Sequence, residues 1–112
     1  MYTNALLTDL YQLTMMQGLY FEGKHNQACV FDRYYRHNPF NGGYTVVAGL
    51  EHLIDYVKNI HFSDDDLAYL KSTGIFEDTF LDYLKRFHFT GSIYAMPEGT
   101  VAFPQEGLLR VE

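Results

Sequence analysis

Two arginines, a histidine and several tyrosines lie close together between positions 31 and 44. They are the side chains of this chain best suited to binding an anion. Arg33, Arg36 and His37 can carry positive charge, and the turn residues Asn41 and Gly42 follow them. A guanidinium group binds phosphate or carboxylate through two parallel hydrogen bonds. In a chain of net charge −6, this cluster of cations beside aromatic rings predicts a site for an anionic, partly planar ligand.

The backbone that carries these residues is predicted to be a strand from Gln27 to Tyr35, because this segment is rich in β-branched and aromatic residues. Side chains alternate between the two faces of a strand, so Arg33 and Tyr35 would face one side, and Tyr34 and Arg36 the other. At most one arginine therefore joins a site on either face. The alternative is that these residues form ordinary ion pairs and stack on neighbouring tyrosines.

Tyr11 is the second candidate for ligand contact, and it lies in a predicted helix. Apolar residues recur at helical spacing from Leu6 to Tyr20, and Thr8 and Asp9 are suited to cap the helix. Because apolar residues surround this helix, we expect it to be buried on more than one side, with Gly18 or Gly23 ending it. Tyr11 is then either a core ring or a ring that projects into a cleft and stacks on a planar heteroaromatic substrate.

The remaining patterns predict an α+β fold. Ser63 is suited to cap a helix that starts at the three consecutive aspartates and stops near Gly74. The glycines at 42 and 43 could line a phosphate, although a plain turn is the more typical role of such a pair. The further predicted helices start at Gly49 and run over Glu77 to Phe87, and the further predicted strands cover 44–47, 92–96, 100–103 and 108–112.

Composition narrows the function classes. A chain of 112 residues fits one domain or part of a larger one, and its acidic balance argues against a general binder of nucleic acid or of membrane surfaces. The sequence has no apolar run near the roughly 18 residues that a membrane span needs. The single cysteine, Cys29, has apolar neighbours, which predicts a buried, reduced thiol and a cytoplasmic location. The histidines lack metal-ligand spacing, and consecutive carboxylates such as those at 64–66 are usually solvated, so no metal site is expected.

Several of these segments together resemble nicotinate phosphoribosyltransferases. The resemblance runs in order over almost the whole chain, and the ordered set is far more specific than any single fragment. The matching segments are Leu6–Met15 (LLTDLYQLTM), Phe31–Phe40 (FDRYYRHNPF), Gly42–Tyr44 (GGY), Ala48–Glu51 (AGLE), Phe89–Gly91 (FTG) and Pro97–Thr100 (PEGT).

The resemblance implies an enzyme that joins nicotinate to phosphoribosyl pyrophosphate and forms nicotinate mononucleotide for NAD synthesis, with ATP hydrolysis and Mg²⁺. It also implies the N-terminal α/β part of a type II phosphoribosyltransferase, which works as a homodimer. By this analogy Tyr11 stacks on the nicotinate ring across the dimer, and Arg36 approaches the phosphates from the neighbouring subunit. Arg33 and His37 are secondary candidates for the anion site, and none of the four is assigned a catalytic step.

Members of the resembled family are much longer, because an α/β barrel follows this part. We therefore expect residues 1–112 to form an incomplete N-terminal domain that does not catalyse alone. One alternative is a small non-catalytic binding module of the lipoyl type, but such modules need a modifiable lysine, and none follows Lys85. Another is an independent subunit that pairs with a separately encoded barrel, with the exposed final strand as its docking edge.

Overall fold

The computed structural model describes residues 4–112 and divides them into two compact units. Unit 1 contains residues 4–27 and 56–89, and unit 2 contains residues 28–55 and 90–112. The boundary at Asp55 falls within helix α2 (Leu50–Asn59). Each unit is therefore built from two segments that are far apart in the sequence.

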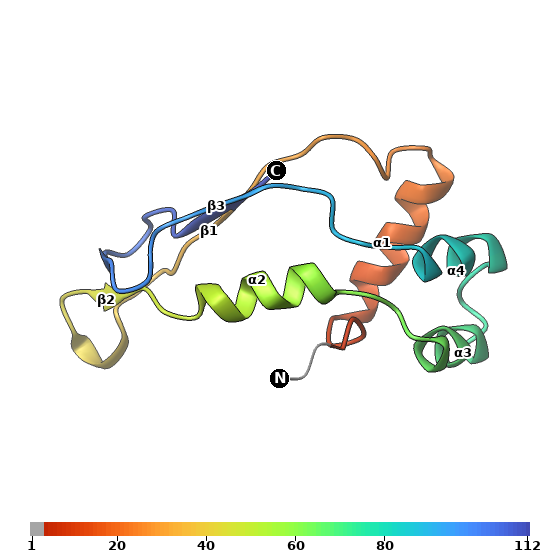
Figure 1. The fold of residues 1–112 in the computed structure, drawn as a ribbon, viewed down its shortest axis with the longest axis horizontal. Coiled ribbons are helices and arrows are strands. Elements are labelled where there is room, and N and C mark those ends of the chain that lie inside the picture. The colour runs from red at the N-terminus through yellow and green to blue at the C-terminus, as the bar shows by residue number, and fades with distance from the viewer. Residues whose placement is uncertain (1–3) are drawn as a thin grey trace. The chain divides into compact units, whose positions relative to one another are not determined.

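Unit 1 is helical and has a hydrophobic core. Its helices are α1 (Leu10–Phe21), α3 (Asp64–Ser72) and α4 (Asp78–Lys85), drawn in Figure 1 in orange-red, green and teal. Phe80 and Leu84 of α4 are fully buried, as the spacing of apolar residues from 77 to 87 predicts. The buried residues of this core are Ala5, Leu13, Phe62, Leu70, Phe76, Phe80, Leu81 and Leu84.

Helix α3 begins at the cap that its sequence predicts. The Asp66 amide donates to the Ser63 hydroxyl oxygen at 3.1 Å, and the Ser63 amide donates to the Asp66 carboxylate at 2.9 Å. This reciprocal pair satisfies two backbone donors that the first turn of a helix leaves free. Asp66 therefore has a local structural role.

Unit 2 is built from short antiparallel strands. One sheet has the order β1-β5-β3, and a separate two-stranded ribbon pairs β2 with β4. A short 3₁₀ turn, η1, covers Pro39–Asn41. The strands are β1 (Phe31–Arg33), β2 (Thr45–Val46), β3 (Ile93–Ala95), β4 (Val101–Ala102) and β5 (Leu109–Val111). All five predicted strands are thus confirmed, each shorter than its sequence pattern.

Two predictions about unit 2 are wrong. The first strand starts at Phe31 and not at Gln27, so Cys29 precedes the sheet and its thiol is exposed rather than buried. The final strand, β5, pairs with a strand on each side and is the centre of its sheet, so it is not an exposed docking edge. Both errors have the same cause, because pairing between distant segments sets where a strand starts and which neighbours it has.

The expectation that α1 is buried on more than one side is also wrong. Leu13 is its only buried residue, and the side chains of Leu10, Met15 and Leu19 are about half exposed or more. The helix continues through Gly18 and ends before Gly23, whose φ of 67° is one that glycine adopts without steric cost. Within residues 4–112, no helix combines the length and the apolar character needed to cross a lipid bilayer.

Candidate functional site

Helix α1 presents Tyr11 on the side opposite its packed face. Leu13 belongs to the core of unit 1, and Met16 and Tyr20 pack against that core. These residues recur at helical spacing and define one face, whereas Tyr11 and Met15 lie on the other. Both of the latter side chains are 57% exposed.

A side-chain amide fixes the rotation of α1. The Gln17 carboxamide oxygen accepts from the Glu77 amide at 2.8 Å, and its nitrogen donates to the Ile75 carbonyl at 3.2 Å. Gln17 therefore binds a backbone amide and a backbone carbonyl of the segment that leads into α4. Because Gln17 lies on the packed side of the helix, its two hydrogen bonds keep Tyr11 on the exposed side.

Tyr11 is not a core residue, so the first of its two interpretations is wrong. Its hydroxyl accepts a hydrogen bond of 3.1 Å from the Gln12 carboxamide, and the faces of its ring are available for stacking. An aromatic ring that a helix holds in an exposed position loses little conformational freedom when it stacks on a planar ligand. The ring is therefore positioned so that a ligand or partner could contact it.

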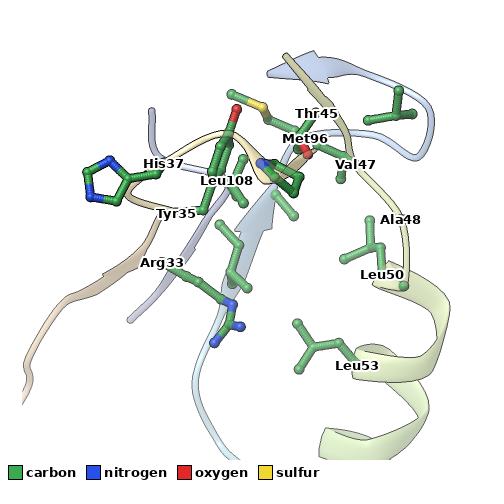
Figure 2. Close-up of a pocket in the computed structure, with 15 residues that line it drawn as sticks. Arg33, Tyr35, His37, Thr45, Val47, Ala48, Leu50, Leu53, Met96 and Leu108 are labelled. Carbon is green, nitrogen blue, oxygen red and sulfur yellow. The ribbon is translucent and has the colours of Figure 1, made fainter. Parts of the chain in front are cut away.

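Unit 2 contains a pocket of about 600 Å³ between its strands and the start of α2. This volume is in the range of small-molecule sites in proteins. Figure 2 shows the pocket, with Leu50 and Leu53 of α2 along one side. Its lining residues are Arg33, Tyr35, His37, Pro39, Thr45, Val46, Val47, Ala48, Gly49, Leu50, Leu53, Ala95, Met96, Leu108 and Leu109.

The polar part of this lining comes from the last residue of β1 and from the segment that follows the strand. Arg33, Tyr35 and His37 contribute to the pocket, and the intervening Arg36 does not. In Figure 2 the Arg33 guanidinium lies at the lower end of the pocket, and the His37 ring points away from the other labelled residues. Of the two arginines, Arg33 is therefore the one whose charge faces this cavity.

Tyr35 closes the upper part of the pocket through its hydroxyl group. The hydroxyl donates to the Ala102 carbonyl oxygen at 2.9 Å and lies 3.0 Å from the Asn38 carboxamide oxygen. Partial burial raises the pKa of Tyr35 above its ordinary value of 10.0, and the Glu106 carboxylate raises it further. The hydroxyl consequently remains a neutral donor and holds the segment 35–38 against β4.

Glu98 positions α2, a role that sequence reasoning missed. Its carboxylate accepts from the Leu50 amide at 2.6 Å, at the first residue of the helix. Two backbone hydrogen bonds support it, from Gly99 to Val47 at 2.8 Å and from Val47 to Thr100 at 2.9 Å. The signal in the sequence is a carboxylate within a Pro-Glu-Gly turn, but its partner lies 48 residues away.

Arg36 lies beyond β1 in an exposed segment. None of the ion pairs within residues 4–112 involves Arg33 or Arg36, and the cation–π contact found in this range joins Arg110 to Tyr94 at 4.9 Å. The alternative that both arginines are held by local partners is therefore not what the described residues show. Both guanidinium groups remain available to an anion.

The described residues do not meet the requirements of a metal-binding site. Residues 4–112 contain no group of three or more histidine, cysteine or acidic side chains that could hold an ion. Of the aspartates at 64–66, Asp64 pairs with Lys85 at 3.0 Å and Asp66 caps α3. These residues do not fit a Mg²⁺ site.

Comparison with known proteins gives a consistent result. The profile of the family described as the nicotinate phosphoribosyltransferase N-terminal domain matches residues 6–112. A nicotinate phosphoribosyltransferase from Dictyostelium discoideum is 42% identical over 99% of this chain and 19% of that protein, and nicotinate phosphoribosyltransferase 2 from Arabidopsis thaliana is 44% identical over 96% and 20%. The crystal structure of human nicotinic acid phosphoribosyltransferase superposes with a TM-score of 0.83 and 33% identity, over 95% of this chain and 22% of that one.

The mixed helix-and-sheet architecture and the family match place this chain in the class of phosphoribosyltransferase N-terminal domains. The chain belongs to the nicotinate phosphoribosyltransferase N-terminal domain family. It spans about a fifth of the length of the curated relatives that it matches.

Proposed function

We propose that this domain takes part in the transfer of a phosphoribosyl group to nicotinate, giving nicotinate mononucleotide for NAD biosynthesis. The relatives named above are nicotinate phosphoribosyltransferases, which supports the reaction and its acceptor. The observation in this chain that carries the proposal is Tyr11, an exposed ring that α1 holds outward by packing and by the Gln17 hydrogen bonds.

In this proposal the Tyr11 ring stacks on the pyridine ring of nicotinate. Stacking fixes the plane of the substrate and holds its ring nitrogen in line with the ribose carbon. The substrate therefore gives up rotational and translational freedom when it binds, and the activation barrier of the reaction step is lower. Because Tyr11 is 57% exposed, atoms outside the described residues must form the rest of this pocket. We place them in a second subunit of a homodimer.

The arginines of unit 2 are proposed to act on charge. Arg36 is the proposed contact to the phosphates of phosphoribosyl pyrophosphate across the dimer, with Arg33 and His37 as secondary candidates. Negative charge develops on the pyrophosphate as the bond to ribose breaks, and a positioned guanidinium lowers that barrier. Arg36 forms none of the ion pairs found within residues 4–112, which supports this role.

We place the ATP and Mg²⁺ sites of the proposed enzyme outside residues 4–112, because the acidic groups of this range do not form a metal site. We propose a cytoplasmic location, because the sequence has a single cysteine and therefore no internal disulfide.

A chimaera tests the proposal. Residues 1–112 replace the matching segment of the Bacillus subtilis nicotinate phosphoribosyltransferase, which is 42% identical over 108 residues that make up 22% of that protein. We expect the chimaera to form nicotinate mononucleotide and the 112-residue chain alone to form none. Tyr11→Ala in the chimaera should lower kcat/KM for nicotinate by roughly tenfold or more, the effect of losing about 1.4 kcal/mol of stacking.

The matched control is Met15→Ala on the same exposed face of α1, which should change kcat/KM less than twofold, since that side chain is not assigned to the ring. Thermal unfolding of both variants checks that folding is intact. Unchanged kinetics for Tyr11→Ala would remove the ring from the site, and turnover by the 112-residue chain alone would contradict the need for the part of the enzyme outside this domain.

A further inference from the structure

The loop between β1 and β2 carries a phenylalanine in a backbone conformation that this residue type rarely adopts. Phe40 has φ 56° and ψ 28°, and Asn41 follows with φ 52°. The Gly42 amide donates to the Pro39 carbonyl at 3.0 Å and closes the turn. Two consecutive residues of positive φ are the mark of a turn type that favours asparagine, aspartate and glycine, so phenylalanine is an unfavourable choice at its first central position.

Among residues 4–112, no packing of the Phe40 side chain compensates for that choice. The Phe40 side chain is 101% exposed, which is the largest value among the large hydrophobic residues described. A ring without contacts contributes no packing energy, and its exposure to water is itself unfavourable. Strained residues of this kind persist at positions where a ligand or partner is contacted.

The base of the loop, in contrast, is held firmly. The Asn38 carboxamide lies 3.0 Å from the Tyr35 hydroxyl, and Pro39 lines the pocket of unit 2. The loop therefore combines an anchored base with a bare aromatic tip. Preorganised aromatic side chains that enter a pocket dominate the binding energy of many protein interfaces.

We propose that Phe40 is an interface anchor that inserts into an apolar cavity of the polypeptide region following this domain in its relatives. The occupant is inferred from length, because the domain accounts for only 19–22% of the relatives that it matches, so most of each relative lies outside it. A second copy of the same 112 residues is the alternative occupant, and self-association of this chain tests it. The inference rests on the larger enzyme of the proposed function but not on its substrate.

The proposal predicts that Phe40→Asn stabilises the 112-residue chain but removes the protection of the loop in the chimaera. In the 112-residue chain, Phe40→Asn should raise Tm by roughly 3–8 °C, because asparagine tolerates positive φ and the exposed ring is removed. In the chimaera described above, the amides of residues 40–44 should exchange with deuterium about tenfold more slowly than in the 112-residue chain, and Phe40→Asn should abolish this protection.

Asn41→Gly is the matched control, because it relaxes the same turn and keeps the ring. It should leave the protection of the loop in the chimaera within about twofold of the unsubstituted protein. A chimaera that lacks turnover but shows protection dependent on Phe40 would reject the proposed function and support the anchor. Equal exchange of the loop in chimaera and isolated chain would overturn the anchor, as would self-association of the 112-residue chain that Phe40→Asn abolishes in sedimentation velocity.

Discussion

The two units of this domain are stabilised in different ways. Among the described residues, the buried apolar side chains of unit 1 form one cluster around Phe80 and Leu84, whereas unit 2 contributes Ala102 to the buried set. The segments of unit 2 are instead held together by strand pairing and by hydrogen bonds such as that from the Tyr35 hydroxyl to the Ala102 carbonyl. Several large side chains of unit 2, including Phe31 and Phe103, are at least half exposed.

This difference indicates which unit can be stabilised by packing of its own residues. A buried cluster gains hydrophobic free energy within the chain, so unit 1 can position Tyr11 with its own residues. Short strands with exposed apolar faces gain little by themselves, because small sheets need further packing for stability. Unit 2, which carries the arginines and Phe40, is therefore the part whose order should depend most on a partner.

The largest effect should come from truncating the core of unit 1. Phe80→Ala is expected to lower the free energy of unfolding of unit 1 by about 3–5 kcal/mol, because it leaves a cavity among Tyr20, Phe76 and Tyr83. Native-state hydrogen exchange of α3 and α4 measures this. The matched substitution in unit 2, Phe31→Ala, removes a ring that is 66% exposed and should cost less than about 0.5 kcal/mol. Equal costs would remove the distinction between the units.

A smaller effect is expected at the start of α2. Glu98→Ala removes the acceptor of the Leu50 amide and should destabilise this turn of unit 2 by about 1–2 kcal/mol. The expected loss is smaller than for a buried hydrogen bond to a charged group, because this site is exposed. Exchange of the Leu50 amide reports the change directly. Glu51→Ala, in the first turn of the same helix, is the control and should affect that amide by less than half as much. A reversed order would mean that helix charge and not the Glu98 contact positions α2.

The cap of α3 in unit 1 should matter about as much as an ordinary helix cap. Ser63→Ala is expected to cost about 1 kcal/mol, since the Asp66 amide loses its acceptor. Denaturation followed by circular dichroism measures this loss. Ser72→Ala removes a hydroxyl near the other end of the same helix and should stay within about 0.5 kcal/mol. A Ser63 effect no larger than this control would show that the capping box is not formed in solution.

The smallest effect is expected from the titration of Tyr35. Its pKa is raised in the folded state, so below pH 10 the hydroxyl is protonated whether the chain is folded or unfolded, and its contribution is fully present. As the pH rises past the ordinary value of 10.0, the unfolded chain loses this proton first and stability falls until the folded Tyr35 ionises too.

Tyr35→Phe should therefore flatten the decline of stability above about pH 10, with the other tyrosines giving the same background in both proteins. Urea denaturation at several alkaline pH values measures the slope. A slope that is the same or steeper in the variant would contradict the raised pKa.

Local elements could be predicted from sequence wherever a short-range pattern fixes them. Ser63 and Asp66 define the start of α3 within four residues, and the apolar spacing from 77 to 87 defines the buried face of α4. The alternation of Arg33, Tyr35 and Arg36 likewise predicted that only one of the two arginines would face a given site. These features depend on backbone periodicity, which a sequence contains directly.

Only the tertiary structure decided the exposure of the Tyr11 face of α1, the central position of β5 in its sheet, and the contact of Glu98 with a helix 48 residues away. The same holds for Cys29, whose apolar neighbours predicted burial although its thiol is exposed. Hydrophobic sequence indicates that a surface will be covered but not which segment covers it. That choice depends on contacts between residues far apart in the chain, which propensity and spacing do not encode.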